Sequence, residues 1–102
     1  MLYLLSQKAT ADLARVASSA RHPTGSENVV EMLEESQYYI EWTAADAEIE
    51  IAAELIDIQR MIVVWRQAWP ESYQSKHLRV LLSVQAKKWS DRVLDYSGLV
   101  DA

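Results

Sequence analysis

The chain has 102 residues, and half of them are apolar, which suits one globular domain with a buried core rather than a disordered segment. It contains no Cys, two Gly and two Pro, so disulfide-stapled miniproteins, cysteine zinc sites and Gly-rich phosphate loops are excluded. The formal net charge is −5. With no signal peptide and no run of about 18 apolar residues, we expect one cytoplasmic domain over 1–102 without membrane association.

Good helix formers fill the chain and predict an all-α fold. The sequence has two breaks, at 22–26 around Pro23 and at 69–72 around Pro70. We therefore expect a first helix over 3–20, a long helical region over 27–69, and a last helix over 73–97 that ends at Gly98. The two breaks should fold these segments into antiparallel hairpins.

The long region carries an apolar stripe at helical spacing from Val30 to Trp69, and its phase does not slip. That pattern favours one continuous central helix of about 43 residues, roughly 65 Å long, and hence a three-helix fold. The alternative is a four-helix bundle in which this region breaks near Thr43, where Thr43-Ala-Ala-Asp46 resembles a capping box.

A second apolar stripe lies on nearly the opposite side of the long region. A helix that is apolar on two sides needs two sets of neighbours, and the two flanking helices cover only one side of a long rod. We therefore predict a two-fold homodimer. The interface residues would be Tyr38, Trp42, Ile49 and Ile56, with Val63, Trp65 and Trp69 at the apolar end of the long region.

Charge is segregated along the chain. Residues 27–59 hold ten carboxylates and neither Lys nor Arg, whereas residues 60–92 hold seven bases and two acids. Antiparallel hairpins would set these segments side by side and pair their charges at the surface. The acidic middle is also the expected contact for a protein partner with a basic surface, through Glu34, Glu35, Glu41, Glu48 and Glu50. The acidic balance argues against direct binding of nucleic acid.

Candidates for catalysis are few. His22 lies in a loop and His77 lies early in the last helix, and neither has a Ser, Cys or Glu-x-x-His arrangement around it. We expect no catalytic residue, no resident metal and no cofactor.

One carboxylate pattern resembles a known family. Glu31-x-x-Glu34 followed by Glu54-x-x-Asp57 is similar to the paired motifs with which the MazG-like all-α NTP pyrophosphohydrolases hold Mg²⁺ on two facing helices. The resemblance covers about 27 residues and implies Mg²⁺ ligands at these four positions, because Mg²⁺ takes hard oxygen ligands and bridges substrate phosphates. The pattern departs from the family at Tyr38, where a further glutamate is usual.

These sequence features support three hypotheses about function. The leading hypothesis is a non-catalytic adaptor or regulatory module that acts as a homodimer and binds another protein. The first alternative is a metal-dependent pyrophosphohydrolase. The second is an acidic protein that inhibits a nucleic-acid-binding protein by mimicking nucleic acid.

Overall fold

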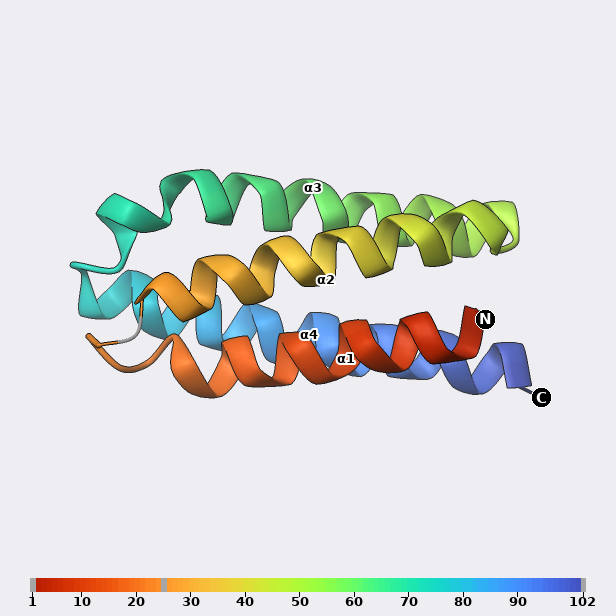
Figure 1. The fold of residues 1–102 in the computed structure, drawn as a ribbon, viewed down its shortest axis with the longest axis horizontal. Coiled ribbons are helices and arrows are strands. Elements are labelled where there is room, and N and C mark those ends of the chain that lie inside the picture. The colour runs from red at the N-terminus through yellow and green to blue at the C-terminus, as the bar shows by residue number, and fades with distance from the viewer. Residues whose placement is uncertain (1, 25, 102) are drawn as a thin grey trace.

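Four helices form almost all of residues 2–24 and 26–101, which are the residues described by this computed structural model. They are α1 (Leu2–Ser19), α2 (Ser26–Asp46), α3 (Ile49–Ser72) and α4 (Lys76–Asp101). Figure 1 shows two layers, with α2 and α3 lying over α1 and α4, and the two ends of the chain at the same end of the bundle. The expectation of an all-α fold is confirmed.

The prediction of one continuous central helix is wrong, because the chain turns back at Ala47 and Glu48. Thr43 does not start a helix, since its Oγ1 donates to the Tyr39 carbonyl oxygen at 2.7 Å and continues the last turns of α2. The Ala47 amide then donates to the Ala44 carbonyl at 3.3 Å, and Glu48 is extended at φ −60° and ψ 152° before α3 begins. The four-helix alternative is the observed one, with its break a few residues after Thr43.

The turn lets one chain bury the main apolar stripe without a partner. Leu33 and Ile40 of α2 and Leu55 and Ile62 of α3 are fully buried in the same hydrophobic core. In a straight rod these side chains would be spread over one long face, and a second molecule would have to cover that face. Folding back therefore removes the original reason for self-association, and only residues left outside this core remain available for it.

Helices α1 and α4 approach closely through small side chains. Ser90 Oγ donates to the Thr10 carbonyl at 3.0 Å, Ser83 Oγ donates to the Ala17 carbonyl, and Ala86 is fully buried. Arg21 Nε donates to Ser83 Oγ at 2.9 Å and extends this contact beyond the end of α1. These hydroxyls satisfy their own hydrogen bonds against the facing backbone, which permits polar residues in a tight helix–helix contact.

The boundaries at the other break also differ from expectation. Helix α3 runs through Pro70 to Ser72, and the Tyr73 amide donates to the Trp69 carbonyl at 2.9 Å. The proline ring is exposed and removes only its own backbone donor, so the helix tolerates it near its end. Arg79 donates to the Tyr73 carbonyl at 2.6 Å and fixes the following turn. The sequence predicts that the last helix ends at Gly98, but α4 continues to Asp101.

The helices follow the order α3, α2, α1, α4 around the bundle. The last pair in this ring, α4 with α3, packs much less closely than the other three. Each of the first three neighbouring pairs packs over most of its length, whereas α3 and α4 meet at far fewer positions. Trp65 Nε1 donates to Gln85 Oε1 at 2.8 Å where they do meet. Within the described residues, no helix combines the length and the apolar character that a membrane crossing requires.

Candidate functional site

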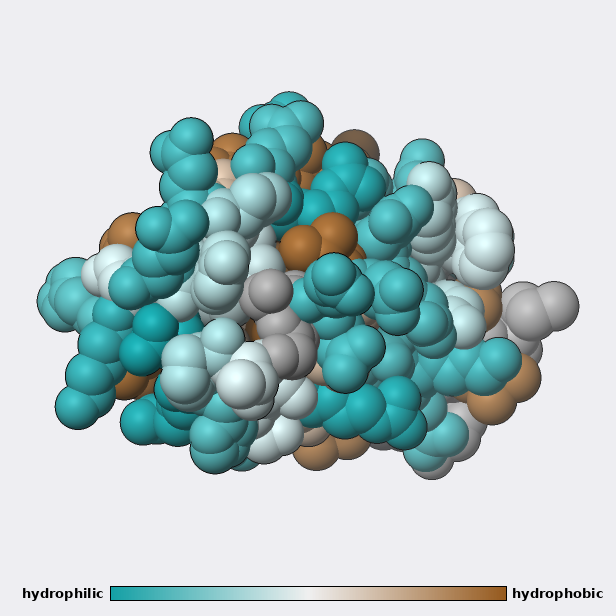
Figure 2. Space-filling model, turned by 60° about the vertical axis from the view of Figure 1, so that its left-hand side comes forward, coloured by the Kyte–Doolittle hydropathy of each residue, from teal (hydrophilic) through white to brown (hydrophobic). Residues whose placement is uncertain are grey.

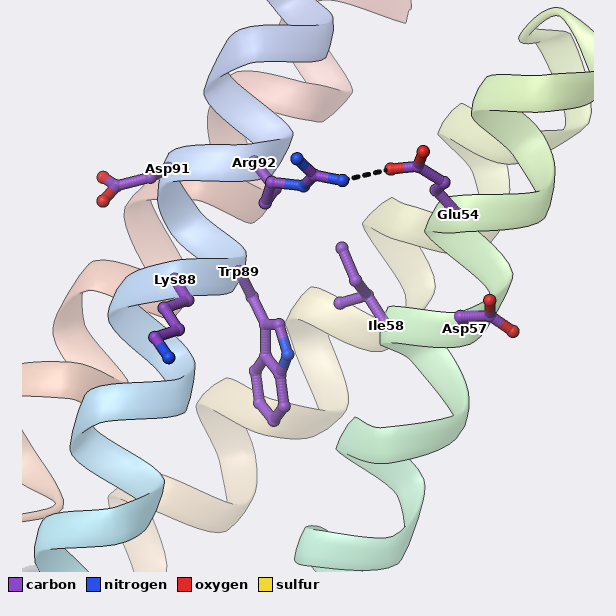
Figure 3. Close-up of a pocket in the computed structure, with 7 residues that line it drawn as sticks. All are labelled: Glu54, Asp57, Ile58, Lys88, Trp89, Asp91 and Arg92. Atoms are coloured by element: carbon purple, nitrogen blue, oxygen red, sulfur yellow. Dashed lines mark hydrogen bonds and ion pairs between the residues drawn. The ribbon is translucent and has the colours of Figure 1, made fainter.

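The α3–α4 side of the bundle holds a groove of about 640 Å³. Ile58 of α3 and Trp89 of α4 form its apolar floor, with exposed fractions of 8% and 6%. Figure 3 shows these two side chains pointing toward each other in the space between the helices. Because α3 and α4 do not close over this floor, the groove leaves apolar atoms accessible to another molecule.

Charged side chains surround the groove. Arg92 of α4 donates to Glu54 of α3 at 2.7 Å, and Figure 3 shows this ion pair spanning the groove. Asp57 and Asp91 point away from the gap between the helices, and Asp91 pairs with Lys87 at 2.9 Å. Both ion pairs are well exposed, so each contributes only about 0.2–1 kcal/mol. These exposed ion pairs therefore contribute little to the stability of the α3–α4 side.

The residues expected at a dimer interface separate into an exposed and an inward set. Tyr38 and Trp42 lie on α2 with ring centroids 6.4 Å apart, and Trp42 is 52% exposed. On α3, Ile56 is exposed and Ile49 is 85% exposed at the first residue of the helix. These four side chains form what we call the outer apolar set: Tyr38, Trp42, Ile49 and Ile56.

The other three expected interface residues lie further inside. Val63 and Trp65 are half-buried, and the Trp65 indole is engaged with Gln85. Trp69 is 1% exposed and belongs to the core, with its ring centroid 6.4 Å from that of Trp65. A shallow hollow lined by Arg60, Met61, Val64 and Trp65 continues the apolar surface along α3.

The end of the bundle that carries the α1–α2 and α3–α4 turns presents a different surface. Figure 2 brings this end forward and shows mainly hydrophilic side chains, with apolar atoms in small separate patches. A broad apolar contact is therefore not offered on the face shown there, and the accessible apolar groups of interest are those of α3 and the second half of α2.

The two layers of the fold carry opposite charge. Helices α2 and α3 with Glu48 hold eleven carboxylates and two arginines, a formal charge of −9. Helices α1 and α4 with Arg21 hold eight bases and four carboxylates, a formal charge of +4. The glutamates expected to contact a basic partner are all exposed on the acidic layer or its turn: Glu34, Glu35, Glu41, Glu48 and Glu50.

The carboxylates of the pyrophosphohydrolase pattern are not gathered into one site. Glu31 and Glu34 are exposed on α2, whereas Glu54 is engaged by Arg92 on the α4 side of α3. Asp57 points away from the groove (Figure 3). Among the residues that the structure describes, no group of three or more His, Asp or Glu side chains is placed to hold a metal ion. The spacing along the chain therefore does not translate into a shared metal site.

A buried carboxyl that the sequence reading did not single out lies between α1 and α2. Asp12 of α1 is 2% exposed, and its Oδ1 accepts a hydrogen bond from Arg15 at 3.2 Å. Its Oδ2 is buried and has no hydrogen-bond partner. Burial and the neighbouring Glu35 carboxylate of α2 raise the pKa of Asp12 to about 6, against a weaker lowering by Arg15.

Tyr39 completes this α1–α2 cluster. Partial burial raises the pKa of its phenol, and the neighbouring Glu35 carboxylate raises it further. Lys8 of α1 lies over the Tyr39 ring at 5.5 Å from its centroid. A sequence signal for Asp12 existed, because it follows the buried Ala9 by three residues and precedes the buried Val16 by four, which is the spacing of a core position.

Comparisons with models of known protein families, with curated proteins and with solved protein structures find no match to this chain.

Proposed function

We propose that this chain is a non-catalytic protein–protein interaction module that self-associates through the exposed side of α3 and the second half of α2. The observation that carries the proposal is the outer apolar set, whose side chains the folded chain leaves outside its core. Ile49 is 85% exposed and Trp42 is 52% exposed, and Tyr38 and Ile56 are also exposed, with the Tyr38 and Trp42 rings in contact. Exposed large apolar side chains mark interfaces, and Trp is enriched at interface centres. A cytoplasmic location remains part of the proposal.

A basic protein is the proposed further partner, and the charge of the acidic layer supports this part of the proposal. Helix α2 carries six carboxylates and no Lys or Arg, so nothing within that helix neutralises them. Such a face attracts a basic surface and speeds its association at low salt. Tyr38 and Trp42 lie among these carboxylates in sequence and offer apolar contacts to the same partner.

The self-association is tested by light scattering on the eluting protein over a dilution series. We expect a mass near twice 11.7 kDa at high concentration, falling toward the monomer on dilution. Trp42→Glu should shift the dissociation to higher protein concentration while the helical circular dichroism is unchanged. Leu94→Asp is the matched control, because Leu94 is also an exposed apolar residue but lies on α4 in the other layer. A monomer at every concentration would refute self-association.

The proposed basic partner is tested separately by measuring binding to a basic helical peptide at increasing salt. Binding that weakens with salt, and weakens further when Glu34 and Glu41 are changed to Gln, is expected. Release of pyrophosphate from a nucleoside triphosphate with Mg²⁺ would instead favour the hydrolase alternative. Salt-sensitive competition with nucleic acid for a third protein would favour mimicry.

A further inference from the structure

The α1–α2 contact contains a buried carboxyl group, and burying it in the ionised form costs free energy that burying it in the protonated form does not. Asp12 is 2% exposed, so an ionised carboxylate there loses nearly all of its hydration. Arg15 compensates one oxygen only, and the Arg15 side chain is itself 67% exposed. The second oxygen, Oδ2, is buried without a hydrogen-bond partner. A buried acceptor left unpaired costs free energy, and a proton on that oxygen would turn it into a donor.

An acceptor for that donor is present on the facing helix. The register that places Lys8 of α1 over the Tyr39 ring of α2 also sets Asp12, one turn further along α1, opposite Glu35, one turn back along α2. The charge of Glu35 and a side-chain hydrogen bond to it both raise the pKa of Asp12. Two carboxylates cannot form such a bond when both are ionised, because each only accepts. Asp12 is the buried member of the pair and Glu35 the exposed one, so the proton is placed on Asp12.

The neighbouring groups favour one proton on the pair rather than two or none. Lys8 of α1 lies over the Tyr39 ring of α2, one turn along α2 from Glu35, and its positive charge is therefore near Glu35. Arg15 is the one cation that acts on Asp12 directly among the described residues. From α4, the other helix packed on α1, the neighbouring contact is the neutral Ser90 hydroxyl on the Thr10 carbonyl. Among the described residues, the buried Asp12 carboxyl therefore has only the largely exposed Arg15 to compensate a negative charge on it.

We propose that Asp12 and Glu35 share a single proton across the α1–α2 contact, and that loss of this proton loosens α1 from α2. The paired state is an Asp12 carboxyl that donates through Oδ2 to the Glu35 carboxylate. Loss of the proton leaves two like charges facing each other, one of them buried. The helix pair thus responds to pH in the range where few side chains other than histidine titrate.

The direction of the effect on stability follows from linkage. The pKa of Asp12 is raised from 3.8 to about 6 in the folded chain, so the folded state binds the proton more tightly than the unfolded state does. The stabilisation is fully present below the unfolded pKa and is lost as pH rises through the folded pKa. For this shift, the unfolding equilibrium constant is expected to rise about tenfold from about pH 5 to about pH 7.

The decisive measurement follows the ¹³C signal of the Asp12 carboxyl by NMR in the unaltered protein and in Glu35→Gln. In the unaltered protein we expect a midpoint well above that of an ordinary aspartate. In Glu35→Gln the facing negative charge is removed, so the midpoint should fall. If the Asp12 midpoint is ordinary, or if it is raised but does not move in Glu35→Gln, proton sharing is refuted, because burial alone would raise it equally in both.

Urea unfolding at several pH values supplies the second readout. Asn at position 12 imitates the protonated carboxyl, since its amide donates to Glu35 and carries no charge. Asp12→Asn should therefore lose the tenfold pH dependence, while Asp57→Asn, the same change at an exposed position on α3, should retain it. An unchanged pH dependence in Asp12→Asn would overturn the proposal.

Discussion

Replacing Ile49 by Asp tests the proposed self-association at a residue whose change should weaken association without destabilising the folded chain. Ile49 is 85% exposed in the single chain, so its side chain keeps almost all of the free energy available from burial in an interface. Full burial of an isoleucine side chain is worth about 1.5–3 kcal/mol. A two-fold interface buries the residue twice, which gives about 3–6 kcal/mol and an increase in the dissociation constant of about two to four orders of magnitude.

The same substitution should leave the monomer intact. Ile49 is the first residue of α3, and a negative charge at a helix N-terminus is stabilising by about 0.3–1 kcal/mol. Sedimentation velocity over a dilution series would report the dissociation constant, and urea unfolding would report the stability of the chain. If Ile49→Asp and the unaltered chain dissociate at the same concentration, Ile49 is not in the interface. If Leu94→Asp weakens the dimer as much as Ile49→Asp does, the interface is elsewhere.

Two further predictions concern the core. Trp69→Ala removes a side chain that is 1% exposed, and the free energy of unfolding in urea should fall by about 3–5 kcal/mol; a fall of less than about 1 kcal/mol would mean that Trp69 is not a core residue. Ala86→Leu adds volume at a fully buried position where α4 packs against α1. This overpacking should lower the free energy of unfolding by about 1–3 kcal/mol. The control Val84→Leu, at an exposed position on α4, should change the free energy of unfolding little.

Much of the architecture follows from residue spacing. The helical composition, the α1 and α4 segments and the buried stripe through Leu33, Ile40, Leu55 and Ile62 were all predictable, since burial follows the 3.6-residue period. The apolar spacing could not decide between a continuous helix and the alternative break near Thr43, because the turn at 47–48 inserts so little chain that the apolar phase runs through it unchanged. A straight rod covered by a partner and a hairpin that covers itself require the same pattern of apolar residues.

The candidate sites were predictable to different degrees. Trp42 and Ile49 lie off the main stripe, and the single chain leaves both exposed, whereas their place in a dimer interface stays a prediction. The groove over Ile58 and Trp89 was not predictable, since it depends on how far α4 stands from α3. Asp12 could have been recognised as a polar residue at a core position. Its facing group, Glu35, becomes known only once the register of α1 against α2 is fixed.

The tight contact between α1 and α4 has a consequence for how the chain reaches its fold. Ser90 and Thr10 are 80 residues apart in sequence, whereas α1 with α2 and α2 with α3 are joined by short turns. Closing so long a loop costs more conformational entropy than closing a hairpin, and pairings between distant segments form slowly. During translation, α1 is synthesised before α4. The side of α1 that later packs against α4 therefore stays in contact with water until α4 has been made. The serines and alanines on these two helices suit that delay, because they offer little apolar surface to a wrong partner in the meantime.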